Sequence, residues 1–311
     1  MGGINTKKFS DMVLSQESYS LRVEDDLIPA PSEFHDELRV IYERCLHTKK
    51  TDGDPDFRIV HEDQGYRCVE INYIDGLAYV LRKISRRILG WKELRLPYSM
   101  IETTLEQGTG SLTKGGIIFV IGKTNSGKST TINALIDEMA KRKSWMFMCY
   151  EDPVEVEFDS TNYDTGAKII QSTISSSGLA RALKTALRAN ADVIKVGEIR
   201  DKEAAHMAID AAIAGHMVVT TLHGSTLEEG LSRFSKWIGD DYSNQLANAF
   251  RCAIYQKLEL GSGINNRMLE IRYLAKTQAV ANTLANGNFQ GLSQQIDSHT
   301  KKYVEGRSLE R

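Results

Sequence analysis

A run of eight residues, G-K-T-N-S-G-K-S at 122–129, has the residue types and spacing of a phosphate-binding loop. Glycines at both ends of the pattern G-x-x-x-x-G-K-S let successive backbone N–H groups turn inward around a polyphosphate. Lys128 can then reach the β and γ phosphates, and the Ser129 hydroxyl can bind Mg²⁺. We therefore expect a nucleoside triphosphate and Mg²⁺ here, bound through Gly122, Thr124, Asn125, Ser126, Gly127, Lys128, Ser129 and Thr130.

The segments on either side of this loop have the required patterns. The apolar run 117–121 is too short to span a membrane and is typical of a buried parallel strand. After the loop, Ile132, Leu135, Ile136 and Met139 recur at helical spacing. The order strand, loop, helix is therefore predicted, and the helix would point its positive dipole end at a bound anion.

Hydrolysis requires acidic groups at other strand ends, and two segments offer them. The strand-like run 192–197 leads directly into Glu198, which is where a Mg²⁺-directing carboxylate belongs in such sheets. A second strand is followed by Glu151, Asp152 and Glu155, which could orient or deprotonate an attacking water. Read from the residues alone, either acidic group could instead be ordinary solvated loop charge.

His216 and His223 bracket the predicted strand 217–221. Their spacing is not that of two metal ligands on one helical face, and no neighbouring carboxylate completes a metal site. Two interpretations remain open from the residues. The histidines could respond to the γ phosphate and to an adjacent segment, or they could be hydrogen-bonded structural residues.

From residue 112 onward, strand patterns alternate with helix patterns, which predicts a doubly wound parallel α/β sheet. The predicted strands are 117–121, 145–150, 193–196 and 217–221, and the predicted helices are 129–142, 178–189, 201–214 and 226–238. Residues 1–95 form a small α+β domain, with strands near 11–14, 20–23, 57–61, 66–73 and 77–84 and a helix over 34–45. A linker is expected over 96–113, followed by an ATPase-type domain over 114–311.

Composition narrows the class of protein. The 39 Lys and Arg residues nearly balance the 41 Asp and Glu residues, so no global field favours nucleic acid or anionic lipid. The cysteines are scattered without a C-x-x-C pair, which indicates reduced thiols and a cytoplasmic location. No apolar run approaches the length of a transmembrane helix, and the N-terminus lacks a signal-peptide core.

A local basic stretch at 82–95 interleaves arginines and lysines with apolar residues. It could bind nucleic acid or membrane, or form a solvated amphipathic face. A third possibility is that arginines from this region complete the nucleotide site of a neighbouring subunit in a ring. The candidates for this role are Arg67, Arg82, Arg86 and Arg87.

Four segments together resemble the secretion ATPase superfamily, the motors of type II and type IV secretion and of type IV pili. They are 122–129, 151–155, 191–201 and 215–223, and they match the Walker A, Asp box, Walker B and His box of that family in order and spacing. The resemblance implies that Glu151 is the general base and that Glu198 holds Mg²⁺. It also implies that His216 and His223 couple the phosphate state to neighbouring elements.

The same resemblance implies a RecA-like motor domain behind a PAS-like N-terminal domain. It further implies ATP as the nucleotide, a homohexameric assembly, and an inner-membrane platform or secretion channel as partner, with peripheral attachment at the inner membrane and no nucleic acid. The expected function is a cytoplasmic hexameric ATPase that drives a type IV secretion or pilus machine. Two alternatives are a RecA-lineage nucleic-acid motor and a ring subunit that binds nucleotide without hydrolysis.

Three departures from the family pattern bear on the branch. The four-cysteine metal element of pilus-assembly and type II secretion motors is absent, which favours the retraction (PilT-like) or type IVB secretion branch. The segment 279–284 retains at best a degenerate form of the retraction signature. Lys195 interrupts a strand that is usually wholly apolar.

Overall fold

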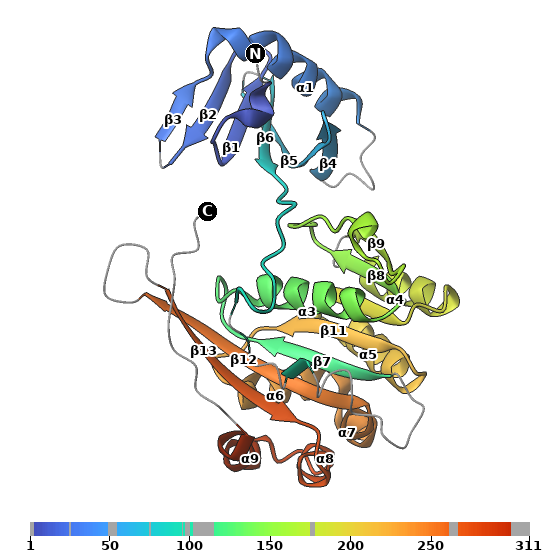
Figure 1. The fold of residues 1–311 in the computed structure, drawn as a ribbon. Coiled ribbons are helices and arrows are strands. Elements are labelled where there is room, and N and C mark those ends of the chain that lie inside the picture. The colour runs from blue at the N-terminus through green and yellow to red at the C-terminus, as the bar shows by residue number, and fades with distance from the viewer. Residues whose placement is uncertain are drawn as a thin grey trace. The chain divides into compact units, whose positions relative to one another are not determined.

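The computed structural model describes residues 3–24, 26–48, 55–74, 76–94, 96, 100–101, 115–174, 178–260 and 267–299. The chain divides into two compact units (Figure 1). The N-terminal unit comprises Met1–Arg87 and Pro153–Glu157, and the motor unit comprises Ile88–Asp152 and Phe158–Arg311. Most of the linker predicted over 96–113 lies outside the described residues.

The N-terminal unit is a six-stranded antiparallel sheet with one long helix, α1 (His35–His47). The strand order is β3-β2-β1-β6-β5-β4. The strands are β1 (Asp11–Ser15), β2 (Tyr19–Val23), β3 (Asp26–Pro29), β4 (Asp56–His61), β5 (Gln64–Tyr73) and β6 (Gly76–Lys83). The core forms where alternate strand residues such as Met12, Leu81 and Tyr66 meet Leu38 and Ile41 of α1.

The strands predicted in this unit are present, and so is the helix, within a few residues at each end. β5 and β6 pair antiparallel up to Tyr73 opposite Gly76. β3 was not predicted. All of its residues are exposed, so its sequence shows no apolar alternation.

A short segment after Asp152 belongs to the N-terminal unit. Val156 forms a parallel bridge with Ser85, and Glu157 accepts hydrogen bonds from the guanidinium groups of Arg58 and Arg86. The chain therefore leaves the motor unit at Asp152 and returns to it at Phe158. Nothing in the local sequence predicts this excursion.

The motor unit is built on a seven-stranded sheet in the order β13-β12-β7-β11-β10-β8-β9. All neighbouring pairs are parallel except β12 and β13. The strands are β7 (Gly116–Ile121), β8 (Met146–Glu151), β9 (Lys168–Thr173), β10 (Val193–Glu198), β11 (Met217–Leu222), β12 (Phe250–Leu260) and β13 (Arg267–Ala275). The helices are α3 (Lys128–Arg142), α4 (Leu179–Arg188), α5 (Lys202–Ile213), α6 (Leu227–Ile238), α7 (Ser243–Ala249), α8 (Gln278–Ala285) and α9 (Leu292–His299).

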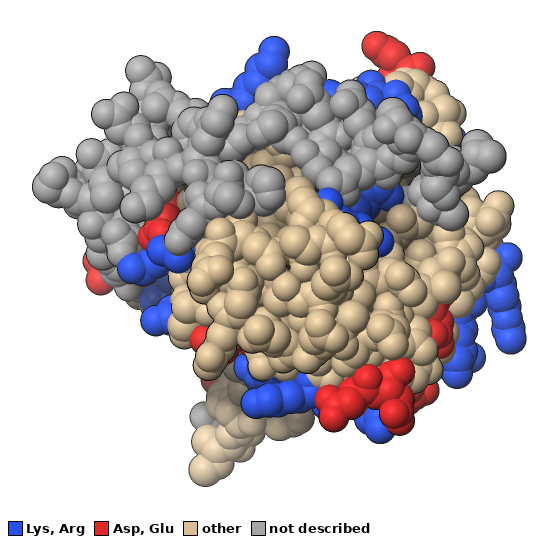
Figure 2. Space-filling view, turned by 90° about the horizontal axis from the view of Figure 1, so that it is seen from below, with Lys and Arg blue, Asp and Glu red and all other residues tan. Residues whose placement is uncertain are grey.

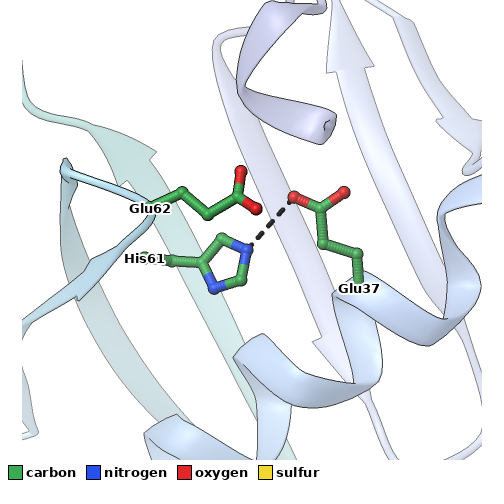
Figure 3. A group of neighbouring side chains, drawn as sticks. All are labelled: Glu37, His61 and Glu62. Atoms are coloured by element: carbon green, nitrogen blue, oxygen red, sulfur yellow. Dashed lines mark hydrogen bonds and ion pairs between the residues drawn. The ribbon is translucent and has the colours of Figure 1, made fainter. Parts of the chain in front are cut away.

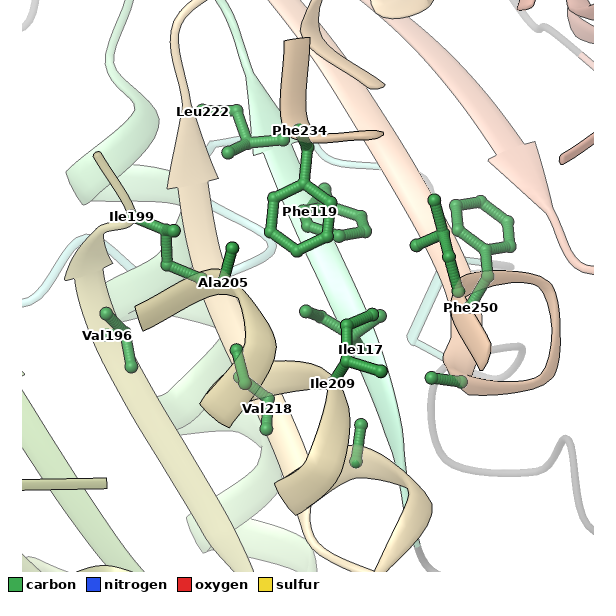
Figure 4. Packing of buried hydrophobic residues seen from close by; sticks show 14 of the residues in the cluster. Ile117, Phe119, Val196, Ile199, Ala205, Ile209, Val218, Leu222, Phe234 and Phe250 are labelled. Atoms are coloured by element: carbon green, nitrogen blue, oxygen red, sulfur yellow. The ribbon is translucent and has the colours of Figure 1, made fainter. Parts of the chain in front are cut away.

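Helices cover both faces of this sheet (Figure 1). α3 packs on one face through Ile132 and Leu135, and α5 and α6 pack on the other. On the second face the rings of Phe119 and Phe234 lie 4.8 Å apart between centroids (Figure 4). β7 is buried on both sides, which explains why residues 117–121 read as a continuous apolar run.

The four strands and four helices predicted for the motor unit are all present with similar bounds. The doubly wound α/β prediction is confirmed, because this mostly parallel sheet has helices on both faces. β9, β12, β13 and the helices α7 to α9 had not been predicted. The degenerate segment 279–284 lies within α8.

Two apolar residues of the basic stretch at 82–95, Ile84 and Trp91, are buried, whereas Ile88 and Leu89 are half-buried. Trp91 is 2% exposed and packs in the same cluster as Val120 and Ile132. Arg95 lies outside the described residues. On the face shown in Figure 2, side chains of both charge signs lie around an area of uncharged residues. The described part of the chain contains no helix long and apolar enough to cross a membrane.

Candidate nucleotide-binding site

Five predicted or newly observed polar groups lie at one edge of the motor sheet. β7, β8, β10, β11 and β12 run parallel, so their carboxyl ends share an edge. The phosphate loop follows β7, Glu151 ends β8, Glu198 ends β10, His223 follows β11, and Gln256 lies on β12 just beyond the residue paired with Ile121. In open α/β sheets, ligands bind at this edge.

The loop has the backbone geometry of an anion cradle. α3 begins at Lys128, and the preceding Gly127 has φ +85°, a left-handed conformation that favours glycine. Asn125 is also left-handed at φ 61°, which asparagine tolerates better than most residues. Thr124, Asn125 and Ser129 are exposed, Thr130 is half-buried, and Ser126 is buried. The first turn of α3 therefore presents its free N–H groups beside the loop.

Gly122 is required by close packing. A Cβ atom there would lie 2.4 Å from the carbonyl oxygen of Gln256 and 2.5 Å from Ser126 Oγ. The Gln256 side chain is 1% exposed, and its Nε2 donates to the Ser126 carbonyl. β12 therefore supports the loop from the side. Gln256 was not predicted, although a buried amide in an apolar strand is a signal that could have identified it.

Lys128 folds back over its own loop. Its Nζ donates to the carbonyl oxygens of Gly122 at 3.0 Å and Lys123 at 2.9 Å. Burial lowers the pKa of Lys128, and the negative charge of Glu198 partly opposes that shift. Glu198 therefore lies within electrostatic reach of the phosphate-binding lysine.

Glu198 is held by a histidine and an arginine side chain. Its Oε1 lies 3.3 Å from His223 Nε2, and its Oε2 lies 2.7 Å from an Arg200 guanidinium nitrogen. A register shift between Val196 and Glu198 marks a bulge in β10, and such bulges re-aim side chains at the end of a strand. The structure thus brings His223 and Glu198 together. No role had been predicted for Arg200, which follows Glu198 by two residues.

Glu151 lies in a buried polar network. Its Oε2 is 2.7 Å from Lys195 Nζ on β10, and its Oε1 accepts a hydrogen bond from Gln171 Nε2 on β9 at 3.1 Å. Lys195 also donates to Asn133 Oδ1 on α3 at 2.6 Å. Glu151 is 5% exposed and Lys195 is 2% exposed. The polar residue that departs from the usual apolar strand is therefore the counter-charge of the predicted base.

The structure does not bring His216 to the phosphate loop. His216 lies at the amino end of β11, where its Nδ1 is 2.6 Å from the Ala191 carbonyl oxygen. His223 lies seven residues further on, roughly 20 Å away along the strand. His216 therefore lies at the opposite edge of the sheet from the phosphate loop of the same chain, because a strand places residues at its two ends on opposite edges.

The predicted arginines lie in the N-terminal unit. Arg67 on β5 and Arg82 on β6 are direct cross-strand neighbours. Arg67 is 3.2 Å from Asp56, and Arg82 Nε donates to Asp11 at 2.7 Å. Arg82 keeps 67% of its side chain exposed. Arg86 forms an ion pair with Glu157. Arg87 ends the first of the two segments that make up this unit.

A second polar group, far from this sheet in sequence, occurs in the N-terminal unit. Ligand atoms of Glu37, His61 and Glu62 lie within 4.8 Å of one another (Figure 3). His61 Nε2 is 3.1 Å from Glu37 Oε1, and the backbone N–H of Ile4 donates to Glu37 Oε2 at 2.8 Å. Both Glu37 oxygens are thus engaged by the chain itself. We therefore interpret this group as a tie between the N-terminal turn, α1 and β4.

The residues at the sheet edge fit a nucleotide with Mg²⁺. The loop is packed so closely at Gly122 that no side chain fits there, as a backbone cradle requires. The exposed Ser129 hydroxyl and the Glu198 carboxylate are hard oxygen ligands of the kind that Mg²⁺ prefers. Ser129 and Glu198 would therefore hold the metal ion, and Gly122 to Thr130 would hold the phosphates.

Comparison with known proteins gives consistent matches. The family model "Type II/IV secretion system protein" matches residues 50–293. The chain is 30% identical over 251 residues to the uncharacterized protein YggR of Escherichia coli, covering 79% of this chain and 74% of the relative.

Two solved structures extend the likeness to the fold. The pilus retraction motor PilT with bound ADP matches with a TM-score of 0.76 and 25% identity, covering 94% of this chain and 86% of that one. The ATPase DotB of Legionella pneumophila matches with a TM-score of 0.74 and 22% identity, covering 93% and 84%. The family model matches most of this chain. The chain therefore belongs to the type II/IV secretion system protein family, whose members include the pilus and secretion ATPases.

Proposed function

We propose that this protein is an ATPase that hydrolyses MgATP at the 122–129 loop and drives a type IV secretion or type IV pilus machine. The observation that carries the proposal is the convergence of the loop, Glu151, Glu198 and His223 on the carboxyl edge of one parallel sheet. A phosphate cradle alone predicts binding. Two carboxylates beside it supply the groups that hydrolysis needs.

Each residue has a role in this scheme. The backbone N–H groups of the loop and the Lys128 ammonium bind the phosphates, and Lys128 exchanges its two carbonyl partners for phosphate oxygens. Ser129 and Glu198 orient the metal ion, which when bound neutralises charge that develops on the phosphates. The Glu151 carboxylate accepts a proton from the attacking water and returns it to solvent.

The Glu198–His223 contact is the element that responds to the phosphate state. His223 shares Glu198 with Arg200, and it directly follows β11, the strand beside the loop strand. Loss of the γ phosphate would change the negative charge near Glu198 and so alter how strongly Glu198 holds these two side chains. The carboxyl end of β11 is therefore the place where hydrolysis is converted into movement.

We further propose that the active form is a cytoplasmic homohexamer, attached peripherally at the inner membrane to a platform or secretion-channel protein. In such a ring, Arg67 and Arg82 of one subunit supply positive charge to the nucleotide site of the next. Their adjacent positions on β5 and β6, and the exposure of Arg82, support this assignment. The family of the chain supports the partner class.

The first test is steady-state ATP turnover of the purified protein. We expect Mg²⁺-dependent hydrolysis, and we expect Lys128→Ala to abolish it. Mixing Arg82→Ala subunits with Lys128→Ala subunits tests the assembly. Turnover of the mixture above that of either variant alone supports action across an interface, and a mixture no more active than the two variants alone contradicts it.

A RecA-lineage nucleic-acid motor is the alternative class. It predicts that single-stranded DNA or RNA stimulates turnover and that binding weakens with salt. Trp91 of the basic stretch supports the secretion motor instead, because its ring is buried and does not offer a surface on which bases could stack. Several-fold stimulation of turnover by nucleic acid at about 150 mM salt would favour the nucleic-acid motor.

A ring subunit that binds nucleotide without turnover is the other alternative, and undetectable hydrolysis would favour it.

A further inference from the structure

Lys195 is a charged residue in the middle of a buried parallel strand. It occupies β10 between Ile194 and Val196, and it pairs across the sheet with Cys149 on β8 and Val219 on β11. Its exposure is 2%. Burial of a lone ammonium is too costly to persist, so a lysine at this position requires fixed partners.

The partners of Lys195 come from two different elements. Its Nζ is 2.7 Å from Glu151 Oε2 and 2.6 Å from Asn133 Oδ1. The ring centroid of Phe158 lies 5.7 Å from the same nitrogen, which is within cation–π range. The other Glu151 oxygen is held by Gln171, whose Oε1 in turn accepts the backbone N–H of Phe158 at 2.8 Å. Both carboxylate oxygens are thereby fixed in direction.

We propose that Lys195 is the positioning residue of the general base: it keeps the buried Glu151 carboxylate ionised and aimed, and it links that carboxylate to the phosphate-loop helix through Asn133. This inference rests on the proposed function, because it assumes that Glu151 acts as the base. Lys195 itself does not touch substrate in this scheme. It acts only through Glu151.

Glu151 needs a charged partner because a general base must be in its ionised form. A buried carboxyl group without a counter-charge favours its neutral form, and a protonated carboxyl cannot accept a proton from water. Lys195 supplies the counter-charge from the neighbouring strand, 44 residues away in sequence. Among the residues that the structure describes, the other titratable group facing the pair is Cys149, whose pKa is raised to about 12 mainly by burial, so its thiol stays neutral. Asn133 and Gln171, the remaining partners, do not titrate.

The contact with Asn133 gives this arrangement a second consequence. Asn133 lies on α3, five residues after Lys128, on the helix that starts from the phosphate loop. A shift of α3 when phosphate binds therefore changes the Asn133–Lys195 hydrogen bond. The base is thereby connected, through the buried contacts Glu151–Lys195–Asn133, to the helix that follows the loop.

The test is the pH dependence of ATP turnover in Lys195→Met, a variant of similar length without the charge. We expect kcat near pH 6.5 to fall by roughly tenfold or more and to recover to within about threefold of wild type near pH 9. The KM for ATP should stay within about twofold, because the phosphate loop is untouched. A fall that is the same at every pH, or no fall, would overturn the proposal.

Lys195→Arg keeps the positive charge and covers the case in which the methionine variant does not fold. We expect the acid limb of its pH profile to stay where the wild type has it, even if kcat is reduced. An acid limb that moves in Lys195→Arg as far as in Lys195→Met would also overturn the proposal.

A parallel arm separates this inference from the proposed function. If wild-type protein hydrolyses ATP and Glu151→Gln does not, the proposed base is established independently of Lys195. If Glu151→Gln hydrolyses ATP as fast as wild type, the base assignment and the Lys195 inference are overturned together. Loss in Glu151→Gln with an unshifted Lys195→Met profile overturns the Lys195 inference alone.

Discussion

Replacing Lys195 with methionine removes one charge of a buried pair and leaves the other in place. The two side chains are 2% and 6% exposed, and the charged atoms are 2.7 Å apart. At an effective dielectric constant of about 20, unit charges at that distance attract by roughly 6 kcal/mol, most of which is offset by their desolvation. Removal of one partner leaves Glu151 buried without compensation. We expect Lys195→Met to lower the free energy of unfolding by about 3–5 kcal/mol.

Urea denaturation followed by tryptophan fluorescence measures this directly, because all three tryptophans lie in the motor unit. With an m-value of about 3 kcal/mol per molar urea, the midpoint should fall by roughly 1–1.7 M. The matched control is the double variant Lys195→Met with Glu151→Gln, which removes both charges. It should lie within about 2 kcal/mol of wild type. A single variant as stable as wild type, or a double variant no more stable than the single, would refute the reasoning.

Three further predictions concern the loop, the metal ligand and the N-terminal sheet. Gly122→Ala should weaken ATP binding by about tenfold or more, since its Cβ would meet the Gln256 backbone, whereas Gly90→Ala, with open space around it, should bind normally in titration calorimetry. Glu198→Gln should keep ATP binding but slow hydrolysis by roughly 10²-fold, and unchanged turnover would remove it from the mechanism. Burial acts to raise the pKa of Asp11, but hydrogen bonds from Arg82 and Ser10 and nearby arginine charges outweigh it, so the pKa lies below 3.8. The depressed pKa of Asp11 contributes stability that is present above the unfolded-state pKa and is lost as pH falls through the folded-state value. The protection factors of the β1 amides, which correct exchange rates for their intrinsic pH dependence, should therefore fall below about pH 4 in wild type, and less so in Asp11→Asn.

Local sequence patterns were sufficient for the elements that position the site. Strands buried on both faces are wholly apolar, as in 117–121, and amphipathic helices such as α3 show their spacing directly. The phosphate loop, Glu151, Glu198 and His223 were identified because each follows such a strand. Exposed edge strands gave no pattern, and β3 was missed for that reason.

Contacts between distant segments were not predictable in the same way. Lys195 was noticed as an anomaly, yet its partner could not be inferred, because the sequence does not state that β8 lies next to β10. Gln256 supports the loop from β12, and that strand had not been predicted. The position of His216 follows from a different consideration. Strand polarity alone places it on the opposite edge from His223, and that geometry outweighs the proximity of the two histidines in sequence.

The central claim is that Glu151 is the base of an ATP-hydrolysing site. Single-turnover and steady-state hydrolysis by Glu151→Gln test it most directly, with ATP affinity measured on the same protein. We predict that affinity remains within about threefold of wild type while kcat falls by roughly 10²–10⁴-fold. Turnover within a factor of about two of wild type, at equal affinity, would contradict the account.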